Sequence, residues 1–155
     1  MTTRHGSAVV TLPSDREILI TRTFEAPAAL VWEAITQPAL IRQWMSETPI
    51  EIITNWKVGD PITIQGDWYH SRFENKGVVL QFEPERILEY SHLSSLSRLP
   101  DQVENYSVIR FALTPLEDGT ELTITLSNFP TEVIYKHLAF YWNVTLVLLK
   151  KFIEQ

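Results

Sequence analysis

Apolar and polar residues alternate along most of the chain up to Asn128, and this period of two predicts β-strands. The stretches that show it best, or that are rich in β-branched residues, are 16–24, 50–53, 62–65, 77–83, 86–92, 105–114 and 120–128. Tight turns such as Asp118-Gly119 separate several of them, which favours a curved antiparallel sheet of about six to seven strands with one buried face. The polar segments 66–75 and 93–104 predict a bend and an exposed loop.

Helical spacing of apolar residues occurs in three segments. Proline suits the first turn of a helix, so Pro27 and Pro38 predict two short helices, 27–36 and one ending at Trp44. The segment 131–154 contains neither glycine nor proline and predicts a helix about 36 Å long. Its apolar residues form one stripe that we expect to face the sheet: Ile134, Leu138, Tyr141, Trp142, Thr145, Leu149 and Phe152, widened by Leu146, Val147 and Leu148.

Residues 1–15 are small and polar, and they predict a flexible N-terminal arm, with a short edge strand at 8–12 as an alternative. Residues 16–155 then form a single α+β domain in which the long helix covers the buried face of the sheet. An open sheet has two free edges, so a homodimer through edge pairing is a further hypothesis.

Composition narrows the classes of function. The net charge of −6 and the scattered basic residues argue against nucleic-acid binding. The chain has no cysteine, which excludes disulfides and thiolate chemistry, and the four histidines form no metal-binding spacing, so we expect no metal and no cofactor. No apolar run is long enough for a membrane span or a signal peptide, and we expect a soluble cytoplasmic protein.

Four segments carry a resemblance to a known family. They are ITRTFEAPAALVWEAITQPALIRQWM (20–45), GVVLQFEPERILEYSH (77–92), DGTELTITLSNFP (118–130), and the helix in which Trp142 is followed by leucines. In this order and spacing they resemble the helix-grip superfamily of START domains, birch-pollen allergens and polyketide cyclases. Within it, the chain is similar to the AHSA-like branch, named after the activator of the heat-shock chaperone ATPase. Met45 stands where that branch often has a second tryptophan.

The resemblance implies a helix-grip fold with a cavity between the sheet and the C-terminal helix, where such proteins hold hydrophobic small molecules or lipids. A binding protein for a hydrophobic or aromatic ligand is therefore our expectation. The residues that we expect to line the cavity are Trp44, Trp68, Tyr90, His92, Phe111, Leu138, Tyr141, Trp142 and Thr145. The polar and aromatic segment 67–72 predicts either the mouth of this cavity or a plain exposed loop.

Two other classes of function stay open. A cyclase-like or hydrolase-like enzyme would use the same cavity, with His92, Tyr90 or His137 as acid or base, because histidine exchanges protons near neutral pH. Each of these three residues can equally be structural, and the sequence favours a binding protein over an enzyme. A protein-interaction module of the chaperone-regulator type is the third class, which the name of the branch suggests.

Overall fold

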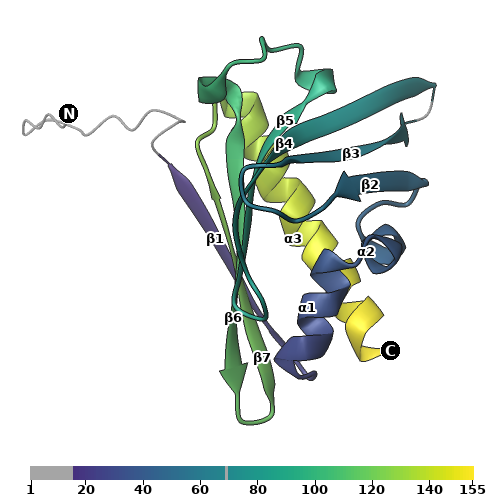
Figure 1. The fold of residues 1–155 in the computed structure, drawn as a ribbon, viewed down its shortest axis with the longest axis vertical. Helices are drawn as coiled ribbons and strands as arrows, with labels where there is room; N and C mark the ends of the chain where they lie inside the picture. Colours follow the sequence, from purple (N-terminus) through teal and green to yellow (C-terminus); the bar gives the residue numbers. More distant parts are fainter. Residues whose placement is uncertain (1–15, 69) are drawn as a thin grey trace, which may run out of the picture.

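The computed structural model describes residues 16–68 and 70–155, without the side chain of Trp68. Seven strands and three α-helices follow one another in a simple order (Figure 1). The strands are β1 (Glu17–Phe24), β2 (Ile50–Thr54), β3 (Pro61–Trp68), β4 (Ser71–Glu83), β5 (Ile87–Ser94), β6 (Ser107–Leu116) and β7 (Gly119–Ser127). The helices are α1 (Ala28–Thr36), α2 (Pro38–Trp44) and α3 (Glu132–Glu154), with the single 3₁₀ turns η2 (Ser95–Ser97) and η3 (Val103–Asn105). The expected arm and its strand at 8–12 lie outside the described residues.

The strands form one antiparallel sheet in the order β1-β7-β6-β5-β4-β3-β2. All strands after β1 follow each other along the chain, while β1 pairs with β7 from the far end of the sequence. The inner face is apolar, and it is continuous from Ile20 on β1 to Ile52 on β2. The α+β fold with a curved antiparallel sheet and a long C-terminal helix is therefore confirmed.

The long helix α3 crosses the inner face of the sheet, with α1 and α2 beside its C-terminal half (Figure 1). Thr131 caps its start by accepting a hydrogen bond from the backbone nitrogen of Ile134 (3.1 Å). The buried stripe is confirmed, and its fully buried members are Leu138, Trp142, Thr145, Leu146 and Leu149. Val147 and Leu148, however, are 47% and 38% exposed, so their predicted place in the stripe was wrong. The sheet covers only one side of α3, and these two residues lie outside that side.

The segment 66–75, which we expected to contain a loop or bend, belongs mostly to the hairpin of β3 and β4, and the chain reverses between the paired residues Trp68 and Ser71. Gly66 pairs with Phe73, and Ile64 pairs with Asn75. The strand is polar because its outward side chains, Arg72 and Glu74, are exposed. This hairpin extends the inner face of the sheet and brings Asn75 onto it, since Asn75 lies between the core residue Ile64 on β3 and Ser94 on β5.

Gly77 marks the tightest approach of β4 to β5. A Cβ atom at this position would lie 1.7 Å from the carbonyl oxygen of Ser91. The Ser91 hydroxyl accepts a hydrogen bond from the backbone nitrogen of Val78 (2.9 Å), and the strand register shifts between Val79 and Gln81. A glycine is therefore required here to let the two strands meet, and this contact fixes the position of the hairpin end that carries Asn75.

No helix among the described residues is both long enough and apolar enough to cross a bilayer.

Candidate functional site

The layer between the sheet and α3 contains five aromatic rings that we call the aromatic cluster: Trp44, Tyr90, Phe111, Tyr141 and Trp142. They come from four elements. Tyr90 on β5 and Phe111 on β6 point inward because alternate residues of a strand face the same side. Tyr141 and Trp142 lie on the inner side of α3, and Trp44 ends α2. The fold thus brings together five of the residues expected to line a cavity.

The rings of the cluster contact one another. The Trp142 ring meets the Phe111 ring edge-on, with centroids 5.5 Å apart and planes at 83°. Its centroid lies 5.2 Å from that of Tyr141 and 6.4 Å from that of Trp44. Tyr90 and Phe111 stack at 6.3 Å. These are the separations of packed aromatic pairs, so the rings fill the space between one another.

Two polar groups of the cluster hold the helices together. The Tyr141 hydroxyl donates to the carbonyl of Met45 (2.6 Å), which ties α3 to the end of α2. The Trp44 Nε1 group donates to the carbonyl of Ala34 (2.9 Å), which ties α2 to α1. Both bonds satisfy a buried polar group, as expected for tyrosine and tryptophan in a core.

Two other polar atoms in this layer are buried without a hydrogen-bond partner in the described part of the protein. They are Nε1 of Trp142, a donor, and Oδ1 of Asn75, an acceptor. Trp142 is only 2% exposed, and Asn75 lies on the core side of β4. Leaving such an atom unsatisfied costs about 1–3 kcal/mol, so each one needs an explanation. Asn75 is absent from the expected site because its segment looked like a bend. The alternation of Phe73, Asn75 and Val79 with outward polar residues was the signal that could have found it.

The ionisable groups of the layer are uncharged at neutral pH. Burial, and secondly the charge of His137, lowers the pKa of His92 to about 4. Burial raises the pKa of Tyr90, and it raises the pKa of Tyr141 to about 12. The fully buried polar residues of the described chain are Thr36, Ser107, Thr120 and Thr145, none of which carries a charge. The layer therefore offers hydrogen bonds and aromatic surface but no counter-ion.

The three candidate acid–base residues do not form a hydrogen-bonded unit. Within the described residues, no hydrogen bond joins His92, Tyr90 and His137 to one another. His137 is exposed on α3, and its ring stacks on Tyr141 at 6.3 Å. His92 lies half-buried on β5 opposite Ser107. A role for these residues in catalysis stays a prediction.

The remaining expected lining residues divide into two cases. Leu138 and Thr145 are buried on the inner side of α3. The side chain of Trp68 lies outside the description, so its contact with the layer stays a prediction. At the neighbouring strand end, Asp67 and Arg72 form an exposed ion pair (3.6 Å).

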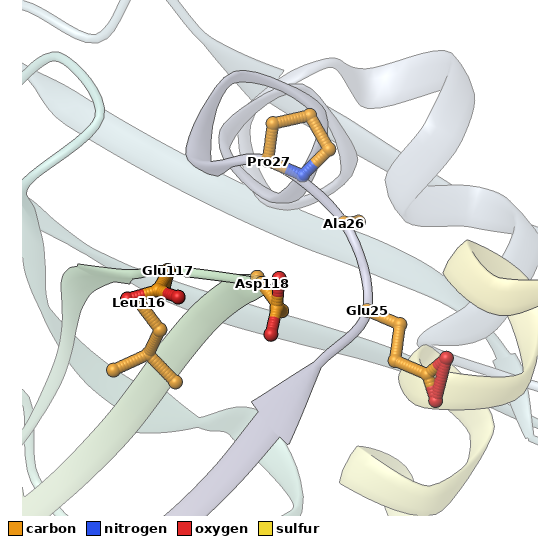
Figure 2. Close-up of a pocket in the computed structure, with 7 residues that line it drawn as sticks. Glu25, Ala26, Pro27, Leu116, Glu117 and Asp118 are labelled. Atoms are coloured by element: carbon orange, nitrogen blue, oxygen red, sulfur yellow. The ribbon is translucent and has the colours of Figure 1, made fainter.

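Two pockets lie at the opposite end of the sheet, and Figure 2 shows the first of them. Their volumes are about 330 and 400 Å³, and both lie between the segment 23–27 and the turn from Leu116 to Gly119. None of the expected lining residues takes part in them. Glu25, Glu117 and Asp118 line both pockets, and Lys150 also lines the second. The described residues contain no group of three or more side chains placed to hold a metal.

The first strand is followed by two short helices, and the sheet wraps a long C-terminal helix. This arrangement defines the helix-grip class of ligand-binding and regulator-like domains. The chain belongs to the family of Activator of Hsp90 ATPase homolog 1-like proteins, whose family model matches residues 25–154.

Solved structures agree with this assignment. Protein ChR145 from Cytophaga hutchinsonii is 37% identical, with 92% of this chain and 97% of that chain covered and a TM-score of 0.77. Protein MLL2253 from Mesorhizobium loti is 26% identical over 89% and 96% of the two chains, with a TM-score of 0.73. The Aha1 dimer from Colwellia psychrerythraea shares the fold at 21% identity over 90% and 96%, with a TM-score of 0.69. A comparison with curated proteins finds no match.

Proposed function

We propose that this protein binds a hydrophobic or aromatic small molecule in the layer between the sheet and α3. The observation that carries the proposal is the pair of buried, unpartnered atoms, Nε1 of Trp142 and Oδ1 of Asn75. A ligand that accepts from Trp142 Nε1, or one that donates to Asn75 Oδ1, would offset about 1–3 kcal/mol for the atom that it reaches. The aromatic cluster would supply the apolar contact surface that small-molecule sites require.

Binding in this layer requires the cluster to open. The rings contact one another in the unliganded fold, and the two pockets lie at the other end of the sheet. At least one ring therefore has to move when a ligand enters. Tyr141 is the least buried of the five rings, which makes it our candidate for the ring that moves, and its hydrogen bond to Met45 would then break.

The variant Trp142→Phe tests the proposal, because it keeps an aromatic ring and removes the Nε1 donor. Compounds would be screened by native mass spectrometry and thermal shift, and affinities measured by calorimetry. We expect the loss of one hydrogen bond to weaken binding by up to about tenfold. In the unliganded protein this change breaks no hydrogen bond, because Nε1 of Trp142 has no partner among the described residues. The free energy of unfolding should therefore not fall on that account.

Trp56→Phe is the matched control, because the Nε1 of Trp56 donates to the carbonyl of Thr36 (2.8 Å). This change should lower the free energy of unfolding by about 1 kcal/mol and leave ligand affinity unchanged. The proposal fails if no apolar compound binds. It also fails if the ligand raises the melting temperature of Trp56→Phe by less than that of Trp142→Phe.

The family description supports a second candidate, a regulator that contacts a heat-shock chaperone. Its test is the ATPase rate of a purified Hsp90-type chaperone with and without this protein. A rate that does not change across a wide excess of the protein would exclude it.

A further inference from the structure

The layer between the sheet and α3 offers no charge to a ligand. No aspartate, glutamate, lysine or arginine is among the fully buried residues of the described chain. His92, Tyr90 and Tyr141 face this layer, and burial shifts the pKa of each away from neutrality, so that all three are uncharged at neutral pH. A charged ligand in the layer would therefore find no counter-ion among the described residues.

The basic residues closest to this layer in the sequence of α3 and β1 are held at its rim. Arg16 pairs with Glu132 (3.2 Å), and Lys150 pairs with Glu154 (2.7 Å). Every other lysine or arginine of the described chain is exposed or half-buried at the surface. The fold thus supplies no cation to a buried carboxylate, and the existing ion pairs would have to break to provide one.

The two unpartnered atoms of the layer differ in kind. Nε1 of Trp142 can only donate, and Oδ1 of Asn75 can only accept. A carboxylate only accepts and an ammonium group only donates, so each of these ions could pair with one of the two atoms but not with the other. A hydroxyl group both donates and accepts. It can therefore satisfy whichever of the two atoms it reaches.

Asn75 lies where the layer becomes polar. It pairs with Ser94 on β5, and His92 lies two positions earlier on the same side of that strand. His92 in turn pairs with the buried Ser107 on β6. Tyr90, two positions before His92, belongs to the aromatic cluster. The inner side of β5 therefore changes from aromatic to polar and uncharged between Tyr90 and Ser94, which suits a ligand with an apolar body and one polar, uncharged group.

We propose that the layer selects an uncharged aromatic ligand that carries a hydroxyl group, and that Trp142 and Asn75 determine this specificity. The inference rests on the proposed function and names the chemical class of its ligand. Transfer of an ion into an interior without a counter-ion is strongly unfavourable. A hydroxyl group also loses its contacts with water, but it regains a hydrogen bond from an atom that otherwise has none.

Four compounds on one skeleton, substituted at the same ring position, test the selection: naphthylmethanol, methylnaphthalene, naphthoate and naphthylmethylammonium. Their affinities for the whole chain would be measured by calorimetry at neutral pH. We expect the alcohol to bind at least about a hundredfold more tightly than either ion. An ion that binds as tightly as the alcohol overturns the inference and leaves the proposed function standing. If none of the four compounds binds, the inference and the proposed function both fall.

The variants Trp142→Phe and Asn75→Leu test which atom meets the hydroxyl group, because each removes one unpartnered atom and keeps an apolar side chain. In at least one of them, the preference for the alcohol over methylnaphthalene should fall by up to about tenfold relative to the wild type. Asn143→Leu is the control, because Asn143 is exposed on α3 and its amide donates to the carbonyl of Ala139 (2.8 Å). This control should keep the preference of the wild type. A preference that is unchanged in both test variants overturns the assignment of Trp142 and Asn75.

Discussion

His92 lies on the inner face of β5 opposite Ser107, and burial lowers the pKa of its imidazole from 6.5 to about 4. The unfolded chain therefore binds a proton at His92 between these two values, while the folded chain does not. The contribution of His92 to the free energy of unfolding is complete above pH 6.5. It is lost as the pH drops towards 4, by at most about 1.4 kcal/mol per pH unit.

We expect the urea midpoint of the wild type to decrease when the pH is lowered from about 7 to about 5. In His92→Gln most of this decrease should be absent. This range lies above the protonation of Asp101 and Glu154, whose pKa values hydrogen bonds from Lys76 and Lys150 lower further. In His137→Gln this decrease of the urea midpoint should become smaller but persist. The change removes only the charge of His137, which is the second cause of the lowered pKa of His92 after burial. Equal losses in the wild type and in His92→Gln would contradict the assignment.

A second residue-scale prediction concerns Gly77. Alanine at this position would put its Cβ against the carbonyl oxygen of Ser91, a rigid backbone atom. We expect Gly77→Ala to lower the free energy of unfolding by about 1–3 kcal/mol, measured by urea denaturation. Gly59→Ala is the comparison, because its Cβ would meet open space and only its positive φ of 94° opposes the change. An unchanged free energy of unfolding in Gly77→Ala would show that the strand contact tolerates a side chain.

The sequence was informative for some site residues and silent for others. Tyr90, Phe111 and Trp142 follow from period-two and helical spacing, which fix the side of an element that faces the core. Asn75 could not be found in this way, because a polar residue in a polar segment looks exposed until strand pairing is known. The lack of a partner for Trp142 Nε1 depends on the distances between elements, which no spacing along the chain reveals.

Among the elements, α3 has the best-defined start. Thr131 Oγ1 accepts from the backbone nitrogen of Ile134 and satisfies one of the free donors of the first turn. Thr131→Ala should lower the free energy of unfolding by about 1 kcal/mol, measured by urea denaturation. Thr131→Ser keeps the acceptor and should lose much less. Equal losses in the two variants would show that the cap contributes nothing.

Helices were easier to predict than strands for physical reasons. Pro27, Pro38 and Thr131 mark helix starts through local backbone chemistry, and the structure begins its helices within one residue of the predicted positions. A strand is stabilised by its neighbours, so the start of β4 at Ser71 depends on pairing with β3. The exposure of Val147 likewise depends on what covers α3, and a broad apolar helix cannot show which side will be covered.

At the scale of the whole molecule, the first strand of the described chain packs against its last strand and last helix. The strand β1 pairs along its full length with β7, Arg16 bridges to Glu132 (3.2 Å), and the backbone nitrogen of Glu25 donates to Glu154 (2.7 Å). The two side-chain contacts join residues 116 and 129 positions apart, and the loop-closure entropy of such long-range contacts has to be overcome during folding.

We therefore expect refolding on a timescale of milliseconds to seconds, as is typical of sheet-rich topologies. Stopped-flow fluorescence after dilution from urea would measure it through the buried tryptophans. A refolding phase in microseconds that recovers the full native signal would contradict the dependence on these long-range contacts.

The unpartnered indole of Trp142 also has a spectroscopic consequence. A proton without an acceptor is less deshielded, so the indole resonance of Trp142 should lie upfield of those of Trp44 and Trp56, whose nitrogens donate to carbonyls. Any molecule that accepts from this nitrogen will move that single resonance downfield. The protein thus contains an internal reporter, at the centre of its own core, of whether that core is occupied.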